Sequence, residues 1–265
     1  MNPQLTTLVC GGDRHLGSIV AALTAIGARV LLQAQDEQEL EAAHRLAGSG
    51  GGRVEVLDAA VGSFQDADDL VARVVRVHGG LDVLLAPPVP TSSDRLVDLG
   101  DEAWHALLAS YQKRAVALAR AAARRFVEQG RGGRILTFSH SGTFASLAPA
   151  SAAMNAAMLS LASAIATSLA EHRVTANCLV LGDDVIVGEP TGSDRNMVSE
   201  LVAHLCTPAA EGISGRFLFA SEHDLGMYSA PMAIANPHAL VRFAEDAPAD
   251  AVSQFLTPLL DIGTT

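Results

Sequence analysis

Several reactive residue types are scarce in this 265-residue chain, and each scarcity excludes a class of function. The chain has only one lysine and two tyrosines. Its net charge of −11 argues against nucleic acid or an anionic membrane as a partner. The three cysteines, Cys10, Cys178 and Cys206, are widely spaced and form no metal-binding or redox motif. Free thiols, together with residues 1–7 that lack a basic leader before a long apolar region, predict a cytoplasmic protein.

Charge is also missing from the 36 residues between Ile135 and Ala170, which include no Asp, Glu, Lys or Arg. Within this stretch, Ile135–His140 has the apolar pattern of a buried strand, and Ser151–Ala170, rich in Ala and free of Gly and Pro, predicts a long helix. A membrane span is the competing interpretation, but the recurring Ser, Thr and Asn favour a helix packed within protein. Because no face of this helix suits water, we expect a sheet to cover one side and a partner to cover the other.

Strand and helix patterns alternate along the rest of the chain. The predicted strands are 5–10, 29–33, 53–57, 81–86, 135–140, 173–180 and 216–220, and the predicted helices are 18–26, 36–47, 64–78, 101–129, 151–170 and 194–206. Such alternation predicts a parallel sheet covered by helices on both faces. The sequence therefore predicts one Rossmann-like, doubly wound α/β domain over residues 1–265, with about 225–265 as a C-terminal extension at a subunit interface.

Two segments of this predicted domain resemble the short-chain dehydrogenase/reductase family. Cys10-Gly11-Gly12-Asp13-Arg14-His15-Leu16-Gly17 occupies the place of the family's Thr-Gly-x-x-x-Gly-x-Gly loop, whose backbone binds the dinucleotide phosphates. The strand and long helix of residues 135–170 match the family's catalytic segment, in which a strand ends at a Ser and the helix opens with Tyr-x-x-x-Lys. Further landmarks follow in family order, namely Asp58 (where the family often contacts adenine), Trp104, Leu181-Gly182 and Ile213-Ser214-Gly215.

The resemblance also identifies what the predicted reaction site lacks. Ser139 or His140 falls at the family's Ser, Ser151 falls at the Tyr and Asn155 falls at the Lys. The single lysine of the chain, Lys113, does not follow either tyrosine at the spacing that the motif needs. Hydride transfer needs an acid/base group whose pKa a nearby cation lowers, and neither a serine hydroxyl nor an amide provides this pair. We therefore expect no catalytic residue and regard these four as positional remnants.

The predicted cofactor site departs from the family in the same way. Gly11, Gly17 and Asp58 remain as remnants, but His15 replaces the middle glycine. After the second strand, Ala34 stands where the family has an acidic or basic residue for the ribose. Pro87-Pro88 replaces the Asn-Asn-Ala-Gly that would line the nicotinamide ribose, and proline offers no N–H donor.

We therefore expect no bound NAD(P), no other cofactor and no metal ion. Binding of a phosphate by Arg14 and a protonated His15 remains an alternative for the same loop.

Two functions are compatible with these features. The first is a catalytically silent subunit that pairs with an active paralogue or with itself, as a dimer or tetramer, through helices 101–129 and 151–170. Lys113, Arg114, Arg120, Arg124, Arg125 and Glu128 are expected to form a charged, solvent-facing side of the first of these helices. The second function is a cofactor-independent lyase, isomerase or cyclase in which His140, between two serines, is the base.

The C-terminal residues refine the first possibility. Gly215–Phe219 and Met227–Pro231 are similar to family members that act on hydroxyacyl-CoA substrates. By this resemblance the chain is compatible with the inactive subunit of the dehydrogenase that oxidises hydroxy(phenyl)methyl-succinyl-CoA.

Overall fold

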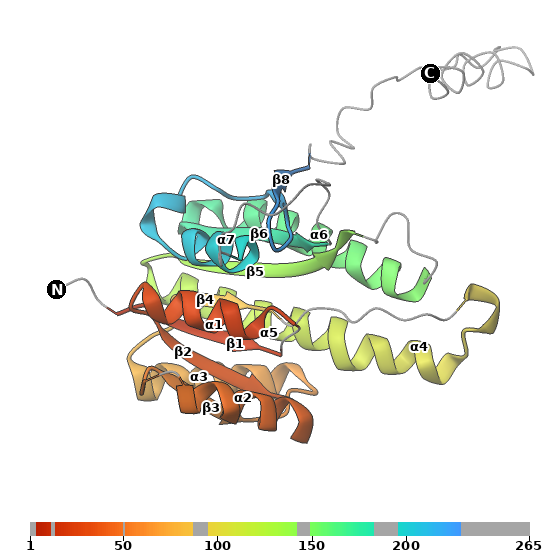
Figure 1. Ribbon diagram of the computed structural model, residues 1–265, viewed down its shortest axis with the longest axis horizontal. Helices are drawn as coiled ribbons and strands as arrows, with labels where there is room; N and C mark the ends of the chain where they lie inside the picture. The colour runs from red at the N-terminus through yellow and green to blue at the C-terminus, as the bar shows by residue number, and fades with distance from the viewer. Residues whose placement is uncertain are drawn as a thin grey trace, which may run out of the picture. The chain divides into compact units, whose positions relative to one another are not determined.

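The computed structural model describes residues 4–11, 14–49, 51–86, 95–141, 149–182 and 196–228 (Figure 1). The described residues belong to one compact unit, Met1–Ser229. Residues 230–265, which include most of the predicted C-terminal extension, lie outside the described part of the chain, as do Pro87 and Pro88.

The centre of the unit is an eight-stranded sheet in the order β3-β2-β1-β4-β5-β6-β7-β8. Strands β1 to β7 pair in parallel, and β8 is antiparallel to β7. Their bounds are β1 (Thr6–Cys10), β2 (Arg29–Ala34), β3 (Val54–Asp58), β4 (Val83–Leu85), β5 (Gly133–His140), β6 (Val174–Leu181), β7 (Phe217–Ala220) and β8 (Leu225–Met227). The predicted doubly wound α/β fold is confirmed. Because strand order reverses between β1 and β4, the carboxyl ends of these two strands mark the place where such folds bind ligands.

Helices cover both faces of this sheet (Figure 1). Apolar side chains of α1 (Leu16–Ala25), α2 (Glu37–Ser49) and α7 (Met197–Leu205) pack into one core. Those of α3 (Phe64–His78) and α5 (Arg114–Gln129) pack into a second core, which the inner side of α6 (Pro149–Ser168) also contacts. The ends of α3 illustrate the local signals, since the Ser63 hydroxyl accepts the N–H of Asp66 and Gly79 terminates the helix with a φ of 81°.

Two features of the fold were not predicted from the sequence. The expected helix 101–129 is divided into α4 (Asp101–Leu107), a π-helical segment (Leu108–Lys113) and α5. The strand β8 is the other, and all three of its residues are exposed. A π segment inserts an extra residue into a helical turn and often marks a functional site.

The helix α6 is, within the described ranges, the one helix long and apolar enough to cross a membrane. It packs against β5 and β6, and the side that faces them includes the buried residues Met154, Met158 and Ala162. The expectation of a sheet on one side of this helix is confirmed. Its opposite side, with Ala153, Ser160 and Ala164, is exposed.

Candidate functional site

Two basic residues, Arg14 and His15, precede α1 in the loop after β1, and their side chains are hydrogen-bonded to each other. Arg14 donates from Nε to Nε2 of His15 at 3.1 Å and from a terminal nitrogen to the carbonyl of Gly182, after β6, at 3.3 Å. His15 is only 2% exposed. Both basic side chains of this loop are therefore engaged within the protein, Arg14 with His15 and with the backbone after β6. Phosphate binding by Arg14 and His15 stays a prediction.

Gly11 and Gly17, the two family glycines that remain at this loop, differ in backbone conformation and in packing. Gly11 retains the left-handed conformation, with a φ of 64°, and its N–H donates to the carbonyl of Gln33 at 3.3 Å. Gly17 lies in the first turn of α1, where an added Cβ would meet only Cδ2 of Leu46 at 3.6 Å. Gly11 therefore keeps a backbone conformation that favours glycine, while the packing around Gly17 has room for an added Cβ.

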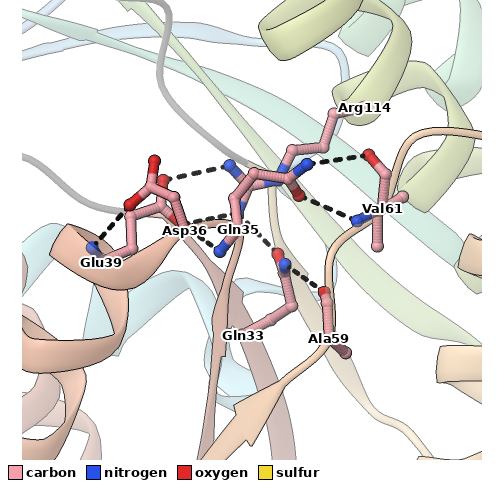
Figure 2. Close-up of polar contacts among 7 residues, drawn as sticks. All are labelled: Gln33, Gln35, Asp36, Glu39, Ala59, Val61 and Arg114. Carbon is pink, nitrogen blue, oxygen red and sulfur yellow. Dashed lines mark hydrogen bonds and ion pairs between the residues drawn. The ribbon is translucent and has the colours of Figure 1, made fainter.

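Arg114, which we expected on a solvent-facing side of its helix, lies buried beside the neighbouring strand ends. Arg114, at the start of α5, has a side chain only 1% exposed and forms an ion pair with Glu39 of α2 at 2.9 Å. It also donates to Oε1 of Gln33, in β2, at 2.6 Å. Figure 2 shows these side chains converging from α5, α2 and β2. The prediction that Arg114 faces solvent is wrong. We call Arg114, Glu39, Gln33 and Gln35 the arginine network.

The two glutamines of the arginine network join β2 to the segment that follows β3. Gln33 donates to the carbonyl of Ala59 at 2.7 Å, while Gln35 accepts the N–H of Val61 at 2.9 Å (Figure 2). The backbone N–H of Gln35 also donates to the carboxylate of Glu39 at 2.8 Å. Every amide and carboxylate of this group therefore has a protein partner. Of the side-chain polar atoms of the arginine network, Nε of Arg114 is the one that is buried without a partner in the described part of the chain.

These contacts bear on whether a dinucleotide fits. The resemblance assigns the carboxyl ends of β2 and β3 to the ribose and the adenine, but the arginine network occupies this edge and uses its own polar groups. Ala34 is buried and offers no ribose ligand, while Asp58, the expected adenine contact, is exposed. This edge therefore offers a buried, internally bonded pair and no free group at the ribose position, which is a poor fit for NAD(P).

The predicted reaction-site remnants lie at the carboxyl end of β5 and at the start of α6. Ser139 is buried and His140 is half-buried, and neither lacks a polar partner. Ser151 and Asn155 are each 2% exposed and lie one turn apart in α6. Asn155 donates from Nδ2 to the carbonyl of Ser151 at 2.8 Å, and its Oδ1 is buried without a partner in the described part of the chain.

These side chains offer little for acid/base chemistry. A serine and a neutral amide occupy the two positions where the family has a phenol and an ammonium group. Tyr111, near which the resemblance places a supporting Asn of the family, belongs to the π segment and packs against the cluster that contains Met154 and Met158.

The described residues also offer no cluster of metal ligands and no reactive thiol. Among the described residues no group of three or more His, Cys, Asp or Glu side chains could hold a metal ion. Burial raises the pKa of Cys10, Cys178 and Cys206 to about 12 in each case, so these thiols stay protonated at neutral pH.

The fold and these strand ends can now be compared with known proteins. A family model described as enoyl-(acyl carrier protein) reductase matches residues 17–183, well over half of the chain. The chain belongs to the short-chain dehydrogenase/reductase family. A similar curated relative is dehydrogenase/reductase SDR family member 4 of Bos taurus, 29% identical over 179 residues, which are 66% of this chain and 64% of that protein. The chain therefore matches slightly less than two thirds of that relative's length.

Two further matches extend over more of the chain. The short-chain reductase protein NovJ of Streptomyces niveus is 25% identical over 241 residues, which cover 85% of this chain and 90% of that protein. Among solved structures, a short chain dehydrogenase from Mycobacterium smegmatis is 26% identical with a TM-score of 0.69, over 83% of this chain and 92% of that chain. This family supplies an oxidoreductase scaffold.

Proposed function

We propose that this chain is a catalytically silent member of the family that assembles with an active paralogue, or with a second copy of itself, and supports the structure of its partner. The observation that carries the proposal is the arginine network, because Arg114 and Glu39 take up the strand ends that a dinucleotide would need. The buried pair Ser151 and Asn155 agrees with it, since these residues give α6 no titratable group near neutral pH.

The outer surfaces of α5 and α6 support the association. Arg120 and Arg124 both pair with Asp68 of α3, at 3.1 and 3.3 Å, so the charges of α5 are directed toward its neighbour in the same chain. This leaves Val116, Ala123 and Val127 as a partly exposed apolar stripe on α5. The exposed side of α6 is made of small residues without charge, which allow close approach of another helix.

Sedimentation of the protein at micromolar concentration tests the association, and we expect a dimer or a larger assembly. Ala164→Arg places a charge on the exposed side of α6 and should shift the protein toward monomer with its helical circular dichroism unchanged. Ala21→Arg, at an exposed position of α1, is the matched control and should leave the assembly intact. A stable, fully monomeric protein would overturn the subunit proposal.

A finer assignment concerns the partner's substrate. The similarity of Gly215–Phe219 and Met227–Pro231 to members acting on hydroxyacyl-CoA substrates supports a partner of that class, such as the dehydrogenase that oxidises hydroxy(phenyl)methyl-succinyl-CoA. Co-purification with an active paralogue that carries Tyr-x-x-x-Lys and oxidises such a thioester is the expected result. Retention of full activity by that paralogue alone would contradict the supporting role.

A cofactor-independent enzyme is the second candidate, because His140 is half-buried at the carboxyl end of β5, the edge where this fold binds ligands. If His140 is a general base for an elimination, isomerisation or cyclisation, His140→Ala should abolish turnover while fold and assembly stay intact. A loss of about 1–3 kcal/mol of stability with no effect on any activity would instead mark it as a structural hydrogen-bonding group.

A further inference from the structure

The opposite edge of the sheet has a pocket of about 340 Å³ that none of the features above involves. Gly133 and Val174, the first residues of β5 and β6, are among its lining residues, so it lies at the amino ends of these strands. Three arginines line it, Arg131, Arg134 and Arg173, together with Thr175, Ser214 and Glu211. This is a concentration of positive charge in a chain whose net charge is −11.

Arg134 is the most enclosed of the three arginines. Its side chain is 13% exposed and donates to the carbonyl of Thr207 at 3.2 Å, while the carboxylate of Glu211 approaches it only to 3.9 Å. Its Nε is buried and, within the described residues, has no hydrogen-bond partner. The guanidinium therefore keeps donor capacity, and its charge is poorly neutralised by a glutamate that is itself largely exposed.

Neighbouring hydroxyl groups add donors to the same pocket. Thr175 lies beside Arg134 in the register of β5 and β6, and adjacent residues of paired strands point to the same face. The hydroxyl of Ser214 accepts the N–H of Ala176 at 3.2 Å, and its own proton has no acceptor in the described structure. Two hydroxyls and a guanidinium can thus point toward one small acceptor group.

The other two arginines of the pocket, Arg131 and Arg173, differ in their contacts with the rest of the protein. Arg131 forms an ion pair with Asp82 at 2.8 Å, which fixes it to the start of β4. Arg173 donates one terminal nitrogen to the carbonyl of Gly130 at 2.6 Å and is otherwise exposed. It is also the one non-glycine among the described residues with positive φ, at 56°. This left-handed conformation ends the short helical turn of residues 170–172, and Arg173 itself lines the pocket.

We propose that this pocket binds a small anion with a phosphate or carboxylate group, held by Arg134 and Arg173 with help from Ser214 and Thr175. Planar guanidinium groups bind both kinds of oxyanion with paired hydrogen bonds, and the volume falls within the lower range of small-molecule sites. Ala166, in the last turn of α6, also lines the pocket, and the carboxyl end of a helix disfavours an anion. Binding must therefore depend on the arginines.

Calorimetric titration with inorganic phosphate, and separately with succinate, tests the site. We expect saturable binding of at least one probe with a Kd below about 1 mM, and the tighter probe identifies the ligand class. Arg134→Met keeps the aliphatic stem and should weaken that binding at least about tenfold. Arg173→Asn should also weaken it, and Asn tolerates the positive φ. Arg76→Met, on α3 and away from the pocket, is the matched control.

The outcomes separate this site from the proposed function, because the pocket lies at the edge of the sheet opposite the arginine network. No saturable heat with either probe up to about 10 mM overturns the anion site and leaves the subunit proposal untouched. Equal affinities in Arg134→Met and Arg76→Met would also overturn it. Should Arg134→Met fail to fold, Arg173→Asn decides in the same way, with unchanged affinity counting against the site.

Discussion

Arg114 and Glu39 form an ion pair of 2.9 Å between α5 and the first turn of α2, although 75 residues separate them in the sequence. The Arg114 side chain is almost wholly buried, whereas Glu39 is partly open to water. A buried guanidinium is stable only where its hydrogen bonds and charge are matched, and Gln33 and Glu39 perform both functions. The pair therefore joins α5 and α2 at the strand ends that the resemblance assigns to a nucleotide.

Removing this guanidinium should cost much more stability than removing an exposed one. We expect Arg114→Met to lower the free energy of unfolding by about 3 kcal/mol, because Glu39 and Gln33 lose their buried partner. Arg120→Met, on the same helix but with a side chain 40% exposed, should cost about 1 kcal/mol or less. Urea denaturation of the two variants measures the difference. Equal losses would mean that the arginine network contributes nothing special to stability.

The strands of this fold could be predicted from the sequence, but the burial of Arg114 could not. Alternating patterns predicted every parallel strand within a few residues, because buried strands and amphipathic helices have different apolar periods. The orientation of Arg114 could not be read in this way, since a regular helical period over residues 101–129 puts it beside Lys113 and Arg120 on one charged side. Only the tertiary structure shows that Glu39 and Gln33 meet Arg114 while the side chain of Arg120 stays 40% exposed. The π segment 108–113, which ends just before Arg114, is not signalled by the local sequence either.

Two glycines should respond in opposite ways to the same substitution. Gly133 opens β5 against Phe126, and a Cβ there would overlap the buried ring, so Gly133→Ala should destabilise the fold by about 1–3 kcal/mol. Gly48 lies in α2 with nothing within 4 Å of an added Cβ, and Gly48→Ala should raise stability by about 0.5–1 kcal/mol. Thermal denaturation of both variants checks the signs, and a stabilised Gly133→Ala would show that β5 and α5 are less tightly packed.

The buried thiols predict a loss of stability at alkaline pH. Burial raises the pKa of Cys206 in the folded protein to about 12, whereas in the unfolded chain the thiol ionises near pH 9. Below pH 9 both states are protonated and this stabilisation is fully present; it is lost as the pH rises from 9 toward 12, at about 1.4 kcal/mol per pH unit for each thiol. Urea titrations at pH 8 and pH 10 measure the slope. Cys206→Ala should reduce it by one thiol's share, and an unchanged slope would contradict the assignment.

The candidate site was only partly predictable, for a different reason. The loss of the family's phenol and ammonium groups could be read directly, because Ser151 and Asn155 stand at those positions. The arginine network could not be predicted, since Arg114, Gln33 and Glu39 come from three separate segments and meet only through tertiary packing. His15 stands at the position of the family's middle glycine, and the sequence does not show that its side chain is buried.

Restoring the missing reaction groups should not by itself restore cofactor binding. In Ser151→Tyr/Asn155→Lys the arginine network is untouched, so both the unmodified chain and the double variant should give no saturable NADH binding with a Kd below about 1 mM. The physical reason is that a dinucleotide would have to separate the buried pair of Arg114 and Glu39. Calorimetry and NADH-dependent reduction of a carbonyl substrate measure the two consequences.

A second set of variants then tests the arginine network itself as the obstacle. Adding Arg114→Ser and Glu39→Ser to the double variant removes the pair together, which avoids leaving one buried charge alone. If the network is what keeps the nucleotide out, NADH affinity should appear only in this quadruple variant. Adding Arg120→Ser and Asp68→Ser instead removes an exposed pair between α5 and α3 and should give no binding. Thermal melts establish that each protein is folded before it is titrated. Submillimolar NADH binding by the unmodified chain would show that the nucleotide and the arginine network coexist, and the cofactor-free interpretation would then be wrong.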